Sequence, residues 1–316
     1  MIITVTMNPA LDKFAKLKTF HYGGLNRLQE IRSHAGGKGI NVSRSIARLG
    51  GRSLAIGLIG GSVGLEIIQE LDQLGISNDM VRVQGNTRTN LKLIDQDHNL
   101  SEFNEDGPKI DEVALLELEM KLMRLAQAQD VVVLSGSVPS NVPVTIYQSL
   151  CEKLKEKQVS VVLDADGDLF RYGIEAKPHV IKPNREELCR YLGAEEQTVK
   201  KEELIEACQR LVDDGIALVI LSLGAQGAVF VSRDALMEAD ALSVPIVSAV
   251  GAGDAMCAAA ALALQRQYPM EELVKLSMAA AASALMCEES ACGDRETVEA
   301  LKKQVQVHKK TIKKRR

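Results

Sequence analysis

The chain alternates short apolar runs with longer amphipathic segments. Six runs of strand length are apolar almost throughout: IITVTM, SLAIGLIG, VVVLSG, VSVVLDAD, HVIKPN and ALVILSLG, at residues 2–7, 53–60, 131–136, 159–166, 179–184 and 217–224. Amphipathic segments of helical length separate them, as at residues 41–50, 112–127 and 201–215. Apolar strands that alternate with helices indicate a parallel sheet covered on both faces. The pattern therefore predicts an α/β fold that binds ligands at the carboxyl ends of its strands.

Two regions break this alternation. Residues 12–33 and 86–105 are more polar and strand-like, and a turn signal lies in DQDHN at residues 95–99. They predict a small antiparallel flap that stands away from the main sheet; the alternative is an ordinary hairpin packed at the edge of that sheet. The sequence contains no evident repeat or interdomain linker. We therefore expect residues 1–316 to form a single domain that carries a lid.

Composition and charge narrow the class of protein. The chain has 316 residues, of which 46% are hydrophobic, and a net charge of −4, which gives no general attraction to nucleic acid or acidic membranes. The six cysteines form no CxxC pair and are expected to be reduced core residues of a cytosolic protein. No secretory signal and no apolar run long enough to span a bilayer is present, which predicts a soluble cytoplasmic protein. The basic run at residues 308–316 is expected to be a frayed, solvated helix end.

A first glycine cluster lies at residues 34–51. Gly36, Gly37 and Gly39 precede a predicted helix, so the backbone can turn tightly there and present bare N–H groups at a helix N-terminus. Lys38 and Asn41 would add side-chain donors. The spacing matches neither the P-loop nor the dinucleotide-binding fingerprint. Taken alone, the cluster is equally well explained as a sterically required turn.

A second glycine cluster lies at residues 251–253, before an alanine-rich helix. Consecutive N–H groups of Gly251, Ala252 and Gly253 would form a nest for developing negative charge. Asp254 follows in the first helical turn, where the helix N-terminus is expected to keep the pKa of its carboxyl low and make it a weak base. Phosphoryl transfer tolerates a weak base, because its loose transition state needs little more than an oriented hydroxyl. The alternative is an aspartate that only caps the helix.

Four motifs together establish a family resemblance. They are AGGKGINVSR at 35–44, KPNREEL at 182–188, SLGAQGA at 222–228 and VGAGDAM at 250–256. In this order they resemble the ribokinase-like sugar kinases, specifically the phosphofructokinase-B branch, over nearly the whole chain. The resemblance implies a ribokinase-like three-layer sandwich with a mostly parallel central sheet and a small β-sheet lid. It also implies phosphoryl transfer from ATP to a sugar with Mg²⁺.

Further segments narrow the branch. TMNPALDK at 6–13, TRTNLKL at 87–93, FNEDGP at 103–108 and SGSVP at 135–139 are similar to 1-phosphofructokinases and tagatose-6-phosphate kinases. The segment from TRTNLKL to FNEDGP looks more like the former. The expected reaction is D-fructose 1-phosphate plus ATP to D-fructose 1,6-bisphosphate plus ADP. A ketofuranose carries hydroxymethyl groups on both sides of its ring oxygen, so D-tagatose 6-phosphate remains the alternative substrate. A non-catalytic sugar-phosphate sensor and a dinucleotide-dependent dehydrogenase are less favoured alternatives.

The resemblance also implies roles around the transferred phosphate. Asp254 would accept the proton of the sugar hydroxyl, and Gly251, Ala252 and Gly253 would form the anion hole. The alanine-rich segment 278–284 would pack near the adenine. The remaining positions implied for nucleotide and metal are Lys182 near the triphosphate, Asn184 and Glu187 holding Mg²⁺ and phosphates, and Ser222, Gly224 and Gly227 in the nucleotide loop.

The sugar site is implied in the same way. The residues implied to hold sugar hydroxyls are Asp12, Gly36, Gly37 and Asn41, and those implied to hold the sugar phosphate are Arg27, Lys38, Arg88 and Ser137. Arginine suits a dianionic phosphate because its planar fork makes paired charge-assisted hydrogen bonds. Arg88 lies on the predicted lid, so a bound phosphosugar is expected to close the lid and exclude water. The resemblance further implies a homodimer that forms through the lid.

Some of these residues have a plainer explanation when each is taken alone. Asn184 and Glu187 lie at a predicted helix start, where both residue types are common in capping positions. Arg88 alone would be a surface charge on a strand. The chain also departs from many relatives at Ala165 and Asp166, where they carry small hydroxyl residues, so the role of that loop stays open.

Overall fold

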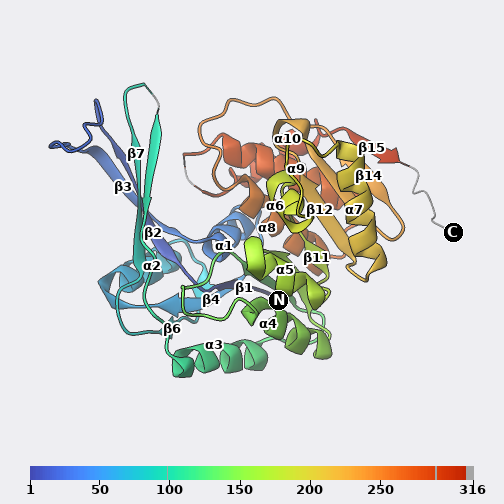
Figure 1. Ribbon diagram of the computed structural model, residues 1–316, viewed down its shortest axis with the longest axis horizontal. Helices are drawn as coiled ribbons and strands as arrows, with labels where there is room; N and C mark the ends of the chain where they lie inside the picture. The colour runs from blue at the N-terminus through green and yellow to red at the C-terminus, as the bar shows by residue number, and fades with distance from the viewer. Residues whose placement is uncertain (98, 289, 311–316) are drawn as a thin grey trace.

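The protein is built around one large sheet flanked by helices (Figure 1). The structure is a computed structural model and describes residues 1–97, 99–288 and 290–310. The strands of the large sheet run in the order β15-β14-β13-β12-β11-β10-β9-β1-β4-β5, and β6 also pairs with β4. Their bounds are β1 Ile2–Thr6, β4 Leu54–Ile59, β5 Ser77–Asn78, β6 Val81–Arg82, β9 Val131–Ser135, β10 Ser160–Asp164, β11 Val180–Ile181, β12 Leu218–Ser222, β13 Ala228–Ser232, β14 Leu236–Ala239 and β15 Val307–Lys310.

Pairing is parallel from β5 through β12, which confirms the mostly parallel sheet predicted from the apolar runs. The last three pairs, from β12 to β15, are antiparallel. This antiparallel extension was not expected from the apolar pattern. The residues of β13 and β14 are separated from β12 and from each other by short turns, and short connections favour antiparallel neighbours.

Helices cover both faces of the large sheet, as the apolar strands require. Along β1, Ile3 and Val5 pack on one face and Ile2 on the other, because successive side chains of a strand point to opposite sides. The first face is covered by α3 Glu112–Leu125, α4 Ile146–Glu156, α5 Gly167–Glu175, α6 Arg185–Tyr191 and α7 Lys201–Asp213. The second is covered by α1 Lys38–Arg48, α8 Ala252–Gln265, α9 Met270–Leu285 and α10 Arg295–Lys302. The three-layer sandwich is thereby confirmed.

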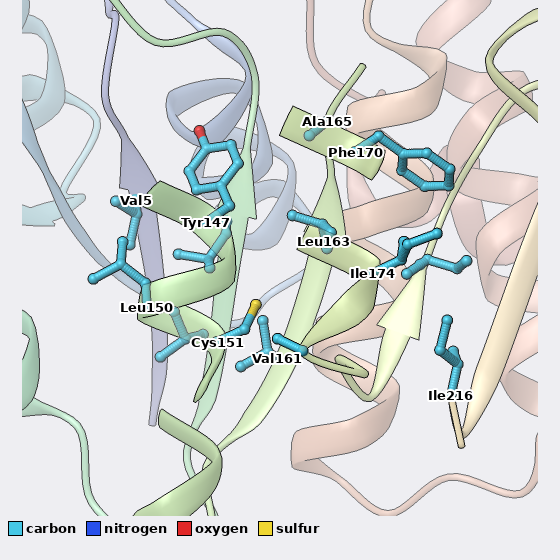
Figure 2. Close-up of a cluster of buried hydrophobic side chains, with 14 of the residues drawn as sticks. Val5, Tyr147, Leu150, Cys151, Val161, Leu163, Ala165, Phe170, Ile174 and Ile216 are labelled. Atoms are coloured by element: carbon cyan, nitrogen blue, oxygen red, sulfur yellow. The ribbon is translucent and has the colours of Figure 1, made fainter. Parts of the chain in front are cut away.

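The core on the first face is dense and apolar. Figure 2 shows Tyr147, Leu150 and Cys151 of α4 packed toward Val161 and Leu163 of β10. The core on the second face is built differently, because α8 contributes a run of alanines at 258–261 that are all fully buried. A helix that is apolar on all sides is expected to lie inside the protein, between the sheet and other helices. This placement puts the N-terminus of α8 at the carboxyl edge of the sheet.

A second, four-stranded sheet stands away from the body and is called the lid here (Figure 1). It consists of β2 Ala10–Lys16, β3 Gln29–Gly36, β7 Arg88–Ile94 and β8 Leu100–Asn104, in the order β3-β2-β7-β8. The prediction of a purely antiparallel flap was wrong, because its central pair, β2 and β7, is parallel. Both strands leave the body at their first residue and run outward, which forces the same direction on them. Helix α2, Gly61–Gln73, packs at the base of the lid.

The C-terminal segment also differs from the sequence-based expectation. Residues Val307–Lys310 form β15 at the sheet edge rather than a helix end, and residues 311–316 of the basic run lie outside the described residues. His308 Nε2 lies 2.9 Å from Asp240 Oδ2, and Lys309 pairs with Glu271. All six cysteines are free thiols, and five are buried as predicted, whereas Cys287 is partly exposed. Across the described ranges, none of the helices has the length and apolar character needed to cross a bilayer.

Candidate active site

A pocket of about 780 Å³ lies at the carboxyl edge of the large sheet, between the body and the base of the lid. Most positions predicted from the sequence line it: Asp12, Gly37, Lys38, Asn41, Arg88, Ser137, Lys182, Asn184, Glu187, Ser222, Gly251, Gly253 and Asp254. These residues come from the ends of strands, from the N-termini of α1, α6 and α8, and from the lid. Segments far apart in the sequence are thus brought into one site, where open α/β sheets bind ligands.

The other predicted positions lie around this pocket rather than in its wall. Gly36 supports Asp12, since a Cβ at that glycine would come within 2.6 Å of the Asp12 Oδ2 atom. Gly224 and Gly227 shape the turn after β12, whose last residue, Ser222, does line the pocket. Ala252 is the first residue of α8. Arg27 is exposed in the turn at the far end of the lid, so the structure does not bring it to the pocket.

The glycines at 251–253 form a tightly constrained corner. Gly251 has a φ of 90°, and a Cβ there would lie 2.6 Å from the carbonyl carbon of Ser290. A Cβ at Gly253 would lie 3.1 Å from the Lys182 Nζ atom. Helix α8 begins directly after Gly251, so the positive end of its dipole points into the pocket. Glycine leaves room at both positions, most strictly at Gly251, where a Cβ would meet backbone atoms.

Asp254 is buried in the first turn of α8 with an exposed fraction of 6%. The Asn41 Nδ2 group donates a hydrogen bond of 2.8 Å to the Asp254 Oδ2 atom. Burial raises the pKa of the Asp254 carboxyl to about 6, against the lowering effect of Lys38, Asn41 and Lys182. The expectation that the helix N-terminus would keep this pKa low was wrong, because desolvation outweighs the stabilising charges. The result is a stronger base than an ordinary aspartate.

Asp164, at the end of β10, is a pocket residue that the sequence analysis missed. Its carboxylate is fully buried, and its Oδ1 atom lies 3.1 Å from Lys38 Nζ and 3.4 Å from Lys182 Nζ. Burial alone would raise the pKa of Asp164, but Lys182 and Lys38 hold it below its ordinary value. The Cys257 thiol lies 3.5 Å from the Oδ2 atom. The available signal was a lone carboxylate at the carboxyl end of an apolar parallel strand.

Lys38 lines the pocket, and its ammonium pairs with the buried Asp164 carboxylate, near enough to Asp254 and Glu187 to feel their charges. Its role at the sugar phosphate, beside Arg88, stays a prediction. The charge of Asp164 is the largest cause of the raised pKa of Lys38, so this lysine stays protonated at neutral pH. Two ammonium groups, from Lys38 and Lys182, therefore stand beside the glycine corner.

The lid contributes a second group of polar side chains. Arg88 is the first residue of β7, and its Nε and Nη2 groups donate to the Asn8 carbonyl oxygen at 3.3 and 3.2 Å. Asn90, two residues further, also lines the pocket and was not predicted. Its Nδ2 group donates to the Asp12 Oδ1 atom at 2.8 Å. Asp12 and Arg88 are thus presented together from the base of the lid.

Asn184 and Glu187 cap α6 and line the pocket at the same time. The Asn184 Oδ1 atom accepts from the Glu187 backbone N–H at 2.7 Å, and the Glu187 Oε2 atom accepts from the Asn184 N–H at 2.8 Å. Both residues therefore cap the helix, as the plainer explanation proposed, and they also line the pocket. Burial raises the pKa of Glu187. Within the described residues no cluster of three or more His, Cys, Asp or Glu side chains is arranged to hold a metal ion.

The chain was compared with known proteins. The family described as pfkB family carbohydrate kinase matches residues 5–297. A 1-phosphofructokinase of Bacillus subtilis is 36% identical over 310 residues, which cover 97% of this chain and 99% of that protein. A 1-phosphofructokinase of Vibrio cholerae is 31% identical over 306 residues, covering 97% and 96%. The solved structure of phosphofructokinase-2 from Escherichia coli in complex with substrates and products has a TM-score of 0.91 at 26% identity, with 96% of this chain and 98% of that chain covered.

The family match spans nearly the whole chain and includes every motif that meets in the pocket. The resemblance and the ribokinase-like fold expected from the sequence are therefore confirmed. The chain belongs to the pfkB family of carbohydrate kinases and is a phosphotransferase with an alcohol group as acceptor.

Proposed function

We propose that the chain is an ATP-dependent 1-phosphofructokinase, which converts D-fructose 1-phosphate and ATP to D-fructose 1,6-bisphosphate and ADP. The observation that carries the proposal is the buried Asp254 carboxylate. It lies beside the glycine corner at the N-terminus of α8, in a pocket that also holds an arginine from the lid. The curated relatives named 1-phosphofructokinase support the choice of substrate.

Asp254 is the group that takes the proton of the attacking hydroxyl. With a pKa of about 6 the carboxylate is mostly ionised at neutral pH, and it is more basic than an exposed aspartate. The hydrogen bond from Asn41 fixes one carboxylate oxygen, which leaves the group oriented for the acceptor. Phosphoryl transfer depends mainly on positioning and charge stabilisation, so this orientation is the main contribution of Asp254.

The charge on the transferred phosphoryl group is stabilised by the glycine corner and two lysines. Gly251 and Gly253 expose backbone N–H groups at the positive end of α8, and Lys38 and Lys182 stand beside them. Asp164 holds both ammonium groups through one oxygen. Such fixed groups stabilise developing charge without having to reorganise during the reaction.

Asn184 and Glu187 have the hard oxygen atoms that Mg²⁺ requires. Both make capping hydrogen bonds, but a carboxylate has about four acceptor positions and an amide oxygen two, so capacity for a cation or its waters remains. When bound, Mg²⁺ would neutralise charge on the ATP phosphates. Magnesium commonly keeps several waters and takes few direct protein ligands, so these two residues and the phosphates would suffice.

The phosphosugar is held between the lid and the body. Arg88 of the lid and Ser137 after β9 hold its phosphate, and Asp12 of the lid and Asn41 of α1 hold its hydroxyls. The guanidinium of Arg88 is partly satisfied by the Asn8 carbonyl, which fixes its direction. Closure of the lid over the sugar excludes water and so limits hydrolysis of ATP.

A phosphosugar panel tests the proposal. ADP release with ATP and Mg²⁺ should show the highest kcat/KM for fructose 1-phosphate, with free fructose at least about 100-fold lower because it offers Arg88 no phosphate to bind. Tagatose 6-phosphate and fructose 6-phosphate complete the panel. A clear preference for tagatose 6-phosphate would replace the proposed substrate, and no turnover with any phosphosugar would favour a non-catalytic sensor.

Asp254→Asn tests the base. We expect kcat to fall by about 100- to 10,000-fold, and the activity of the parent to decline below about pH 6 as Asp254 becomes protonated. The folded-state pKa lies above the unfolded value of 3.8, so the ionised carboxylate costs stability at high pH and this cost disappears as the pH falls. Chemical denaturation should therefore find the variant more stable than the parent at pH 8 by about 1–3 kcal/mol, and by less at pH 5. Equal turnover of variant and parent would remove Asp254 from catalysis.

Gly251→Ala tests the glycine corner. The added Cβ meets the Ser290 carbonyl and the left-handed backbone is strained, so we expect kcat to fall about 100-fold and stability by about 1–3 kcal/mol. Gly75→Ala is the matched control, because Gly75 has a φ of 68° but no atom near its Cβ position. It should lose stability and keep its kcat. If Gly251→Ala has the same kcat as Gly75→Ala, the glycine corner is not needed for phosphoryl transfer.

The lid supports a homodimer. It exposes large apolar side chains, Tyr22 at 96%, Leu25 at 74% and Ile31 at 58%, which a lone chain would leave in water. Light scattering at assay concentration should give the mass of two 34.3 kDa chains. Leu25→Glu combined with Ile31→Glu should shift the protein toward monomer, whereas Leu116→Glu on α3 should not. A monomeric parent would contradict the dimer.

A further inference from the structure

Among the lid residues that face the pocket, Asn90 lies between two charged side chains and contacts both. On β7, Arg88, Asn90 and Lys92 share one face because side chains alternate along a strand. In the parallel register Asn90 lies opposite Asp12 of β2. The Asn90 Nδ2 group donates to Asp12 Oδ1 at 2.8 Å, and the Asn90 Oδ1 atom accepts from Arg88 Nη1 at 3.3 Å. One short side chain therefore links the two charged residues.

The chemistry of the two neighbours dictates the residue between them. A guanidinium has only donors and a carboxylate has only acceptors, so the linking group must accept on one side and donate on the other. A primary amide meets both demands in one fixed orientation. A carboxylate at position 90 would face Asp12 with like charge, and an alkyl group would leave both neighbours without this partner.

The link matters because Arg88 and Asp12 are otherwise held by separate contacts. Arg88 is anchored by the Asn8 carbonyl. Asp12 has an exposed fraction of 6%, and its Oδ2 atom lies 3.9 Å from the Lys92 Nζ atom. In the pocket, Asn90 is the side chain that joins these two anchored groups to each other. The spacing of guanidinium and carboxylate thus depends on it.

We propose that Asn90 is a positioning residue that sets the distance between the Arg88 guanidinium and the Asp12 carboxylate. It thereby selects sugar phosphates whose phosphate and ring hydroxyl match that distance. The inference rests on the proposed function, which assigns Arg88 to the phosphate and Asp12 to a hydroxyl. It adds Asn90 as the residue that links the phosphate-binding group to the hydroxyl-binding group and determines specificity.

The variants Asn90→Asp and Asn90→Ala test whether Asn90 positions the sugar-binding groups or only supports the fold. Asn90→Asp is nearly isosteric, but it sets a second carboxylate against Asp12 and partly neutralises Arg88. We expect the KM for fructose 1-phosphate to rise at least about 10-fold in Asn90→Ala, which loses both contacts. It should rise further in Asn90→Asp, which turns the contact with Asp12 into a repulsion and makes the Arg88 guanidinium less available to the phosphate. The KM for ATP and the kcat at saturating sugar should stay within about two-fold, because Asn90 does not contact the glycine corner.

The selectivity for a phosphorylated sugar gives a second readout. The ratio of kcat/KM for fructose 1-phosphate to that for free fructose should fall at least about 10-fold in both variants. Calorimetric titration of fructose 1-phosphate without nucleotide should show the same weakening, independently of turnover. Asn104→Ala is the matched control, because Asn104 pairs with Asn90 across β7 and β8 and is exposed. It should behave like the parent in every assay.

The outcomes distinguish the inference from the proposed function. A parent that binds and phosphorylates fructose 1-phosphate, with variants that lose sugar affinity and selectivity alone, supports the role of Asn90. Variants whose KM and selectivity match those of Asn104→Ala overturn it and leave the proposed function standing. Equal loss of affinity for ATP and sugar would mark Asn90 as merely structural and also overturn it. A parent that binds no phosphosugar overturns the proposed function itself, and the role of Asn90 with it.

Discussion

The site depends on keeping an ionised carboxylate, Asp254, away from water. Removing such a group from solvent is costly, and the pKa of about 6 expresses that cost. The site limits it with the Asn41 amide and with the charges of Lys38 and Lys182. Those lysines are in turn held by Asp164, which is itself fully buried. Each of these charged groups therefore needs the others to be in place.

The fold supplies this arrangement through the direction of its elements. The parallel strands β1, β9, β10 and β12 end at one edge of the sheet, and α1 and α8 begin there. Because α8 is buried on all sides, its N-terminus can enter the pocket directly under the lid. The alanines that make this burial possible contribute no polar chemistry, yet they determine where Asp254 lies. The packing of α8 in the core therefore also determines the geometry of the site.

Much of this was predictable from the sequence, for physical reasons. Apolar runs bounded by glycine and polar residues predicted β1, β4, β9, β10 and β12, since fully buried strands have no other pattern. The glycine clusters and the motif residues were found because backbone turns and charged side chains leave strong local signals. The parallel pairing of β2 with β7 had no such signal, because it is set by where both strands leave the body.

The features that could not be predicted from the sequence share one cause. Their properties are set by residues that are distant in the sequence and outweigh the local sequence signal. The helix N-terminus favours an ionised Asp254, but burial reverses the sign of the shift of its pKa. Asp164 is one carboxylate after an apolar strand, and only the fold brings it between two lysines that lie 144 positions apart (38 and 182). Asn90 gains its partner Asp12 from a strand that lies 78 residues earlier.

The most direct measurement is the titration of the Asp254 carboxyl carbon, followed by NMR on protein labelled with ¹³C-aspartate and assigned by its absence from the asparagine variant. The expected midpoint lies near pH 6. A midpoint at or below the ordinary aspartate value of 3.8 would mean that burial does not outweigh the stabilising charges of Lys38 and Lys182, and would contradict a base strengthened by burial.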